Sequence, residues 1–595
     1  MSSDSFTTRP ELAGTFGAVA STHWLASQSG MAVLEEGGNA FDAAVATAFT
    51  LHVVEPHLNG PGGDLSLIFR RAGAEPGVLC GQGVAPAAAT IEAMTSQGLA
   101  VVPGTGLLAA TVPGAVPAWL TLLRDHGTMT PGQVLRFAIG YAEHGHPVVA
   151  RVVATIATMA DFFVEHWPTS AATWLPAPAA GQLQRSPILA ATYRRLVREA
   201  ETAGTTPETR EAQCDAALRA WSQGFVAEAV DVFARQGYRD SSGSDHVGLV
   251  TGSDLAAWAP TYDVPMSVDW RGRRVFKCAG WTQGPAFLAS LALLDTLPDR
   301  IDELDAALIH QIVESQKLAF ADRDAWFGDA PYAPDLAGLL DPGYVADRRA
   351  LVGDTASREL RPGRLGGREP RLPDAVGPAG ETPTASPGIG EPTVKREGVA
   401  NGDTCHLDVV DRWGNVVSAT PSGGWLQSSP TVPGLGFCLG TRLQMVWLEP
   451  GFASSLVPGR RPRSTLSPGL AIGPDDETIS FGTPGGDQQD QWPLVFWLLH
   501  TLGGRDLQAA IDHPSFDTTA LVSSFEPRTY VPAGLEIEDR YPPATIEGLR
   551  GRGHDVTVRP GWSLGRMSAA AHDPATGIIR AAANARGMQG YAVAR

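Results

Sequence analysis

Cysteine is scarce in this 595-residue sequence, and the few cysteines are scattered along it. There are five, an odd number without a CxxC pair: Cys80, Cys214, Cys278, Cys405 and Cys438. A disulfide framework or a cysteine-based zinc site is therefore not expected, and a reducing compartment is favoured.

Long hydrophobic runs are also missing. No uninterrupted apolar run approaches the about 20 residues that a membrane-spanning helix requires. The first 21 residues have no charged start followed by an apolar core, so they do not predict a signal peptide. We therefore expect a cytoplasmic protein.

Positive charge is in deficit. The formal net charge of −18 disfavours nucleic acid and anionic membranes as partners. The length and the 43% apolar content allow a large core or several domains. Helical and strand patterns mix throughout without an internal repeat, which predicts an α+β fold.

The main elements follow from periodicity, caps and breakers. Asn39 is a predicted N-cap, and a Gly-rich loop at 59–64 lacks the lysine and the spacing of a phosphate loop. The predicted helices are Ala40–Val54, Pro117–His126, Pro131–His144, Pro187–Glu201, Phe225–Gln236, Ala306–Trp326 and Pro493–Leu502. The predicted strands include Leu65–Arg70, Asp269–Cys278 and Thr478–Phe481.

The segment 401–424 (NGDTCHLDVVDRWGNVVSATPSGG) predicts a β-hairpin whose first strand begins at a hydroxyl residue, Thr404. The residues after Thr404 alternate between two faces, which is the period of a strand. A Gly- and Asn-containing turn at 411–415 joins it to a second β-branched strand at 416–420. One face carries Cys405, Leu407 and Val409, and the other carries His406, Asp408 and Val410.

The segment before this hairpin, 354–403, is rich in proline, glycine and charge. Long structureless loops are uncommon in compact chains and are usually functional or cut. Because this loop ends at a Thr-led strand, we predict cleavage between Asp403 and Thr404. The new N-terminal threonine would carry a nucleophilic hydroxyl and an α-amine of pKa about 7.7–8.0, suited to general base catalysis.

Two neighbours of Thr404 are alternatives for its roles. Cys405 is a rival nucleophile because thiolate is intrinsically stronger, but its side chain faces the other side of the strand. It is better interpreted as a small core residue. His406 shares a face with Thr404 and is an alternative base, although strand histidines are more often structural and the amine makes it redundant.

Seven segments that match one known protein family occur in that family's order across nearly the whole chain, from Gly17 to Gly590. They are GMAVLEEGGNAFDAAVA, VPGAVPAWLTLLRDHGTMT, GLVTGSDLAAW, SQKLAFADRDAWFGD, the TCH strand, RPRSTLSP and GTPGG. Together they resemble the γ-glutamyltranspeptidase family of N-terminal-nucleophile hydrolases. The resemblance implies a four-layer αββα sandwich and self-cleavage through an ester. It implies a large subunit, 1–403, and a small catalytic subunit, 404–595, that stay associated, with no metal or organic cofactor.

The resemblance also assigns site residues. Gly485 and Gly486 match the pair that forms the oxyanion hole, and consecutive glycines can present two N–H groups to an anion. Thr420 matches a threonine near the nucleophile, and Ser422 matches a second hydroxyl position. Ser464 and Thr465 match a serine pair that helps to hold the substrate carboxylate.

The glutamate-binding residues of the family are largely missing. Ile91 stands where the family has an arginine, and Gly424 where it has an asparagine. Arg442 and Met445 align with the glutamine and aspartate that take the α-amino group. Arg442 offers a cation for an acidic substrate, unless it is a surface arginine. The sequence thus resembles the divergent branch of cephalosporin acylases, oxamate-type amidohydrolases and homologues that hydrolyse a C–C bond.

We expect an autoprocessing acyl hydrolase or transferase that cleaves an amide-type bond through a threonyl acyl-enzyme, not a standard γ-glutamyl enzyme. One alternative is a C–C bond hydrolase of a secondary-metabolite pathway that uses the same threonine. The other is an unprocessed, inactive scaffold homologue. The expected partners are a small-molecule substrate and the two fragments of the precursor, with neither nucleic acid nor membrane.

Overall fold

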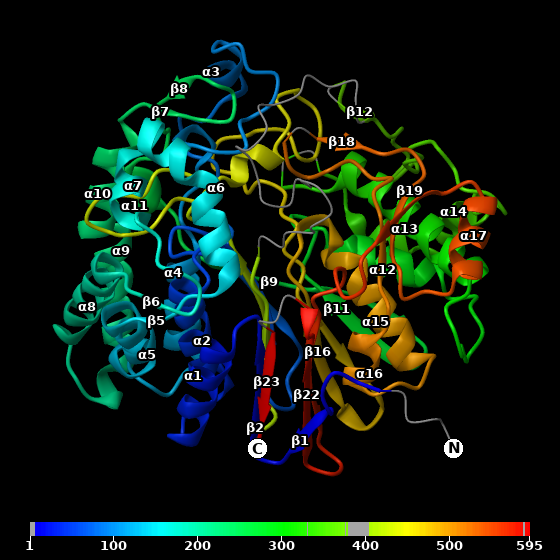
Figure 1. Cartoon of the computed structure of the whole chain (residues 1–595), viewed down its shortest axis with the longest axis horizontal. Helices are drawn as coiled ribbons and strands as arrows, with labels where there is room; N and C mark the ends of the chain where they lie inside the picture. Colours follow the sequence, from blue (N-terminus) through cyan, green and yellow to red (C-terminus); the bar gives the residue numbers. More distant parts are fainter. Residues whose placement is uncertain are drawn as a thin grey trace.

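Two seven-stranded antiparallel sheets lie face to face at the centre of the molecule (Figure 1). The computed structural model describes residues 6–329, 331, 333–374, 376–378, 404–526, 528–586 and 590–595. Sheet I has the order β23 (Tyr591–Ala594), β2 (Gly17–Ser21), β13 (Leu407–Asp411), β14 (Val416–Ser422), β3 (Asp64–Arg70), β4 (Gly77–Cys80) and β9 (Thr261–Asp263). Sheet II has the order β1 (Leu12–Gly14), β22 (Ile578–Ala583), β21 (Ser568–Asp573), β16 (Thr478–Gly482), β15 (Gly469–Ile472), β11 (Arg273–Lys277) and β10 (Met266–Trp270).

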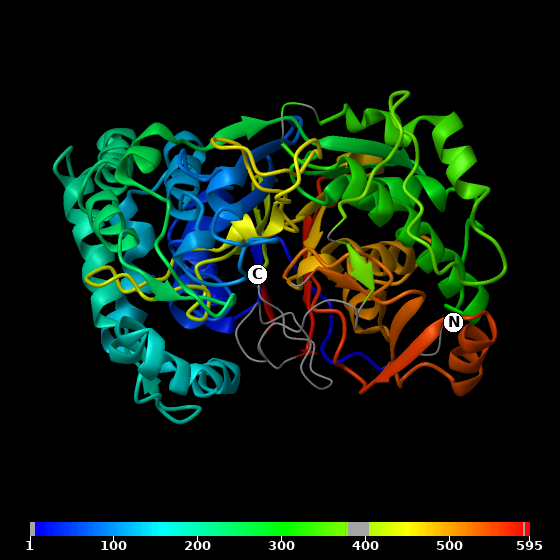
Figure 2. The same ribbon diagram turned by 90° about the horizontal axis from the view of Figure 1, so that it is seen from above.

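Helices cover the outer face of each sheet, as the view from above also shows (Figure 2). Sheet I is covered by α1 (Trp24–Glu35), α2 (Ala40–Val54) and α4 (Ala115–His126), with α5 (Pro131–His144) packed on α2. Sheet II is covered by α12 (Gly284–Leu293), α13 (Ala306–Trp326), α15 (Trp492–Thr501) and α16 (Leu507–Asp512). The predicted α+β class and the four-layer αββα sandwich are confirmed.

The remaining elements lie outside these layers. The helices are α3 (Ile91–Thr95), α6 (Ala150–His166), α7 (Pro168–Trp174), α8 (Pro187–Glu201), α9 (Arg210–Ser222), α10 (Phe225–Ala234), α11 (Gly252–Ala257), α14 (Pro342–Arg349) and α17 (Pro543–Gly551). The short strands are β5 (His146–Pro147), β6 (Leu183–Gln184), β7 (Tyr238–Arg239), β8 (Asp245–His246), β12 (Gly377–Pro378), β17 (Phe516–Thr518), β18 (Thr529–Tyr530), β19 (Gly534–Glu538) and β20 (Asp555–Arg559). None of the described helices is long and apolar enough to cross a membrane.

Small side chains fill the space between the two sheets. Ala18 and Ala20 of sheet I and Ala570 and Ala581 of sheet II are all buried in one apolar cluster there. Because alternate strand residues point to opposite faces, each strand sends one set of side chains inward and the other toward the helices. This thin central layer holds the first hairpin strand, β13, against β16 and β21.

Both sheets combine strands from either side of residue 404. In sheet I, β13 lies between β2 and β14, and β14 pairs with β3. A cut before Thr404 would therefore leave the two fragments sharing both sheets, which supports the predicted association. Residues 354–374 contain no helix or strand, while most of the rest of the predicted loop, including Asp403, lies outside the described residues.

The helix predictions are largely confirmed. Helices α2, α5, α8 and α13 have the predicted bounds, and Asn39 caps α2 in a capping box with Asp42. One strand prediction was wrong, because Asp269–Cys278 is divided between β10 and β11. Arg271 and Gly272 have positive φ angles of 52° and 75° and reverse the chain between them. An arginine is an unusual residue for that conformation, so the turn had little local signal.

Candidate active site

Thr404 lies at the open end of the β13–β14 hairpin and forms a bridge with Ser422. Its hydroxyl oxygen is 3.1 Å from the Ser422 hydroxyl oxygen, within hydrogen-bond distance. Both side chains are 1% exposed in the uncleaved chain. The two hydroxyl residues that the sequence predicted for the site are therefore brought into direct contact.

Two further polar pairs continue from this contact along the hairpin. His406 Nδ1 lies 2.9 Å from Thr420 Oγ1, and Ser418 donates to Asp408 Oδ1 at 3.0 Å. The antiparallel register places the members of each pair opposite each other on the strands. We call these six residues the polar ladder: Thr404, Ser422, His406, Thr420, Asp408 and Ser418.

The polar ladder faces sheet II and fixes the orientation of His406. His406 Nε2 lies 3.1 Å from Asp408 Oδ2, which also accepts a hydrogen bond from Ser568 of β21 at 2.9 Å. Because the carboxylate only accepts, His406 Nε2 carries the proton and Nδ1 accepts from Thr420. Both ring nitrogens are therefore engaged away from Thr404, which favours the structural interpretation of His406.

Cys405 points to the opposite side of the strand, toward the helices. Its thiol donates to Glu55 Oε2 at 3.1 Å and accepts from Asn59 Nδ2 at 3.2 Å. It is fully buried in the core between sheet I and its helices. The predicted orientation of Cys405 is confirmed.

The predicted oxyanion turn follows β16 at the same end of the sheets. An added Cβ at Gly482 would lie 2.3 Å from the His406 ring, so the end of β16 contacts the polar ladder. Pro484 then lines a small cavity of about 20 Å³ together with Glu55, the acceptor of the Cys405 thiol. The turn at 485–486 therefore lies beside the start of the hairpin.

Gly485 and Gly486 both have positive φ, 120° and 52°; Gly485 is the N-cap and Gly486 the first residue of the 3₁₀ helix Gly486–Asp490. An added Cβ at Gly485 would lie 2.9 Å from the Trp492 ring. Neither N–H donates to an acceptor among the residues that the structure describes. Two unengaged N–H groups at a helix start suit an anion or a developing oxyanion.

Arg442 is buried beside the hairpin, so it is not the surface arginine of the alternative interpretation. Its Nε and Nη2 donate to the two carboxylate oxygens of Asp64 at 2.6 and 2.9 Å. Asp64 in turn pairs with Ser422 in the register of β3 and β14. The Arg442 cation lies near the nucleophile, but Asp64 already balances its charge. Sequence analysis missed Asp64, whose signal was its place at the end of the Gly-rich loop.

Ser464 and Thr465 lie in a buried segment next to residues 281–282. The Ser464 N–H donates to the Trp281 carbonyl at 2.8 Å, and its hydroxyl accepts from the Leu466 N–H at 3.2 Å. The Thr465 hydroxyl is buried and has no hydrogen-bond partner among the described residues. It is thus available to a bound molecule.

At the positions where the family's glutamate-binding residues are missing, the present residues are packed into the fold. Ile91 begins α3 and packs against an apolar cluster, and Met445 is fully buried. Gly424 has a φ of 65°, and a Cβ there would lie 2.8 Å from the Gly63 nitrogen. A larger side chain at position 424 therefore does not fit this backbone.

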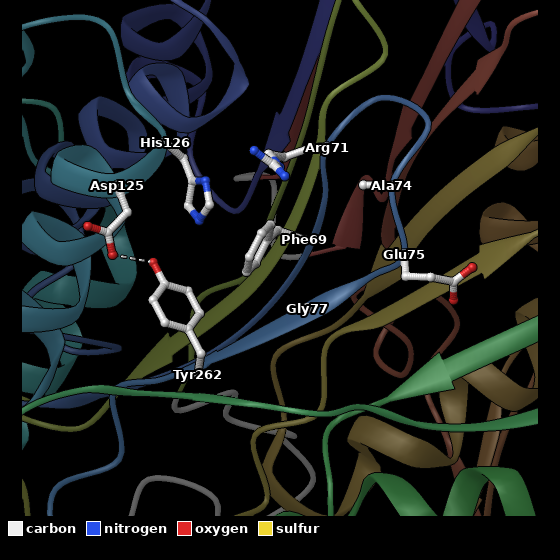
Figure 3. A pocket seen from close by; sticks show the side chains of 8 residues that line it. All are labelled: Phe69, Arg71, Ala74, Glu75, Gly77, Asp125, His126 and Tyr262. Carbon is white, nitrogen blue, oxygen red and sulfur yellow. Dashed lines mark hydrogen bonds between the residues drawn. The ribbon is translucent and has the colours of Figure 1, made fainter.

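A separate cavity lies at the other end of sheet I (Figure 3). It has a volume of about 360 Å³ and is lined by Phe69, Arg71, Ala74, Glu75, Gly77, Asp125, His126 and Tyr262. Phe69 pairs with Val417, whereas Asp64 pairs with Ser422. These positions are five residue steps apart along the strand, about 17 Å at about 3.3 Å per step, so this cavity does not adjoin Thr404.

One group of residues has the chemistry of metal ligands among those described: His310, Glu314 and His554. Its donor atoms are already engaged. His310 Nδ1 lies 2.8 Å from His554 Nε2, and the Glu314 carboxylate binds Lys317 and Arg361. The residues therefore fit a hydrogen-bonded cluster better than a metal site, and the cofactor prediction remains a prediction.

Comparison with known proteins adds independent findings. The model of the gamma-glutamyltranspeptidase family matches residues 26–594. The oxamate amidohydrolase proenzyme of Klebsiella pneumoniae is 31% identical over 588 residues, covering 96% of this chain and 97% of that protein. The solved structure of LmbA2991HD is 54% identical with a TM-score of 0.93, covering 99% of this chain and all of that one. Cephalosporin acylase from Bacillus halodurans is 26% identical with a TM-score of 0.80, covering 100% and 98% of the two chains.

Proposed function

Because this chain belongs to the γ-glutamyltranspeptidase family of N-terminal-nucleophile hydrolases, we propose that it is a self-cleaving amidohydrolase with Thr404 as nucleophile. The observation that carries this proposal is the Thr404–Ser422 contact at 3.1 Å, at the end of the polar ladder. The similarity to proteins named as proenzymes supports the cleavage. Asp403, on the other side of the proposed cut, lies outside the described residues.

Self-cleavage proceeds by an N-to-O acyl shift. The Thr404 oxygen attacks the Asp403 carbonyl carbon, the peptide C–N bond breaks, and the proton of the hydroxyl passes to the released amine. Water then hydrolyses the ester, which frees Thr404 with its α-amine. Ser422 orients the attacking hydroxyl because it is its hydrogen-bond partner in the uncleaved chain.

Turnover of substrate uses the same oxygen. The α-amine takes the Thr404 proton as the oxygen attacks the substrate carbonyl, and the N–H groups of Gly485 and Gly486 stabilise the oxyanion. The protonated amine then delivers its proton to the leaving nitrogen. Water releases the acyl group in hydrolysis, whereas an amine acceptor would make the reaction a transfer.

The substrate is a small acid amide rather than a γ-glutamyl compound. Ile91, Gly424 and Met445 leave the glutamyl α-amino and α-carboxyl groups without their partners. A buried site without those partners does not offset their desolvation. Similarity to an oxamate amidohydrolase supports a short acyl group that ends in a carboxylate.

Intact mass and N-terminal sequencing of the purified protein test the proposal. We expect two associated fragments of about 42 and 20 kDa, the smaller starting at Thr404. Thr404→Ala should give one species of 62.6 kDa without activity. Cleavage or turnover by Thr404→Ala would refute the assignment.

A substrate panel of oxamate, γ-glutamyl anilides and 2-oxo acids then identifies the bond that is cleaved. Turnover of oxamate supports the amidohydrolase. Release of a carboxylate from a carbon chain would instead support the C–C hydrolase. An uncleaved wild-type protein without turnover of any compound would support the scaffold alternative.

A further inference from the structure

Five buried charged residues lie together behind the Gly485–Gly486 turn. They are Arg323, Arg463, Arg528, Asp324 and Asp487, which we call the arginine cluster. Three guanidinium groups face two carboxylates, so the cluster holds one more positive than negative charge. A buried charge without a partner is costly, and proteins normally pair it with a counter-ion.

Arg323 takes most of the negative charge of the two carboxylates. Its Nε donates to Asp324 Oδ1 at 3.0 Å, and its Nη1 donates to Asp487. Asp487 also accepts from the N–H and hydroxyl of Ser524, at 2.9 and 2.6 Å. Arg463 Nη2 lies farther away, 3.9 Å from Asp324 Oδ1, so Arg463 and Arg528 share the excess positive charge.

Arg463 and Arg528 each have one guanidinium nitrogen without a hydrogen-bond partner among the described residues. Arg463 Nη2 donates to Ser524 at 2.9 Å, but its Nη1 is buried and has no partner among the described residues. Arg528 donates from Nη2 to the carbonyls of Gln444 and Val446, and its guanidinium lies 4.0 Å from the centre of the Trp447 ring. Arg528 Nη1 is likewise buried without a partner in the described chain.

Burial and the neighbouring positive charges destabilise the charged form of both Arg463 and Arg528. Burial, followed by the neighbouring Arg463, lowers the pKa of Arg528 to about 9. Burial, followed by Arg323, lowers the pKa of Arg463 to about 10. Both groups remain cationic at neutral pH, and a bound anion would relieve both causes at once.

The arginine cluster adjoins the residues assigned to catalysis and binding. Asp487 directly follows Gly486, and Gln283 joins the Gly486 carbonyl to Arg323 through hydrogen bonds of 3.3 and 3.1 Å. Arg463 directly precedes Ser464 and Thr465. Thr465, whose hydroxyl has no partner among the described residues, thus stands two positions after Arg463, whose Nη1 also has none.

We infer that Arg463 and Arg528 bind the terminal carboxylate of the acyl group, so that the enzyme selects short acyl groups ending in an anion. This inference rests on the proposed function. Arg442 is unsuited to the same task because Asp64 binds it through both carboxylate oxygens. The two guanidinium Nη1 groups and the Thr465 hydroxyl are donors without partners among the described residues, and a carboxylate has enough acceptor sites for all three.

Oxalate binding tests the inference without relying on turnover. We would measure thermal stabilisation of the purified wild-type protein by oxalate, with neutral oxamide as the matched probe. Oxalate should raise the Tm and oxamide should not. Arg463→Gln and Arg528→Gln should each lose this rise, whereas Arg463→Lys, which keeps the charge, should retain part of it.

Arg348→Gln is the matched control, because Arg348 is also buried and paired with a carboxylate, Asp322, but belongs to α14. It should keep the oxalate effect of the wild type. The unliganded Tm and circular dichroism of each variant show whether it folds. Equal stabilisation of Arg463→Gln and wild type by oxalate would overturn the inference, as would the absence of any effect on wild type.

Kinetics separates this inference from the proposed function. With oxamate as substrate, Arg463→Gln should lower kcat/KM at least tenfold through KM, while self-cleavage, followed by intact mass, is unchanged. Unchanged kinetics would overturn the anion site and leave the nucleophile assignment intact. Self-cleavage by Thr404→Ala would refute the nucleophile, yet the oxalate measurement would still report on the arginines.

Discussion

The hydroxyl oxygens of Thr404 and Ser422 lie 3.1 Å apart across the first rung of the hairpin, before any cleavage has taken place. The attacking group is thus held by a neighbour that the strand register supplies, since Ser422 stands opposite Thr404. The contact that would orient the hydroxyl in the proposed self-cleavage is therefore present in the uncleaved chain.

Removing the Ser422 hydroxyl should slow self-cleavage. A neutral hydrogen bond contributes about 0.5–1.5 kcal/mol, so Ser422→Ala should reduce the rate by about threefold to tenfold. A time course of precursor and fragments on a gel measures it. Ser290→Ala is the control, because that buried hydroxyl of α12 bonds only to a helix carbonyl, Ala286. Unchanged cleavage in Ser422→Ala would show that the contact does not orient the nucleophile.

Replacing Cys405 should leave the chemistry intact. Its thiol faces Glu55 and Asn59 on the helix side of the strand, away from Thr404. We expect Cys405→Ser to self-cleave and to retain activity within about threefold, since the loss is one of packing. Mass spectrometry and initial rates report both properties. A variant as inactive as Thr404→Ala would make the thiol the nucleophile.

Gly485→Ala should impair turnover strongly. The φ of 120° and the 2.9 Å approach to Trp492 require a shift of the turn that presents the oxyanion donors. Losing one such donor typically lowers kcat by about 10²–10³-fold. Gly504→Ala is the control, since Gly504 also has a positive φ, 61°, but has nothing within 4 Å of an added Cβ. Equal effects of the two substitutions would trace the loss to backbone strain alone.

Breaking the Asp64–Arg442 pair should destabilise the fold. Asp64→Asn removes the carboxylate that binds the buried Arg442 guanidinium through both oxygens, and breaking a buried ion pair costs about 3–5 kcal/mol. The double variant Asp64→Asn with Arg442→Met removes that charge and should recover part of the loss. Thermal unfolding of Asp64→Asn, Arg442→Met, the double variant and wild type gives the coupling free energy between the two side chains. Additive losses in the double variant would contradict a direct interaction.

Acid should destabilise the protein well before its carboxylates titrate. Burial lowers the pKa of His23, His52 and His57 from 6.5 to about 3, so each stays neutral in the folded chain. Above pH 6.5 these histidines are neutral in both the folded and the unfolded chain, so the fold keeps its full stability. As pH falls from 6.5 toward 3, they bind protons in the unfolded chain but not in the folded one, and the free energy of unfolding decreases. Each contributes a slope of up to about 1.4 kcal/mol per pH unit in that window. A Tm that stays constant between pH 7 and 4.5 would contradict this.

Local patterns predicted much of the fold and part of the site. Helix α2 follows from an N-cap and alanine spacing, and the hairpin faces follow from strict alternation. Distant pairings could not be predicted in this way. Asp64 and Arg442 are 378 positions apart, and no local pattern indicates that Arg463, within the RPRST motif, joins Arg528 in a buried cluster.

The strand that carries Ser568 is synthesised well after the hairpin, which limits how early the proposed self-cleavage can occur. Asp408 is held by Ser568, β16 contacts His406, and β2 pairs with the last strand, β23. A nascent chain that ends before β21 lacks these supports around Thr404. The proposed self-cleavage would then follow the assembly of both sheets, and products truncated before β21 would remain in one piece.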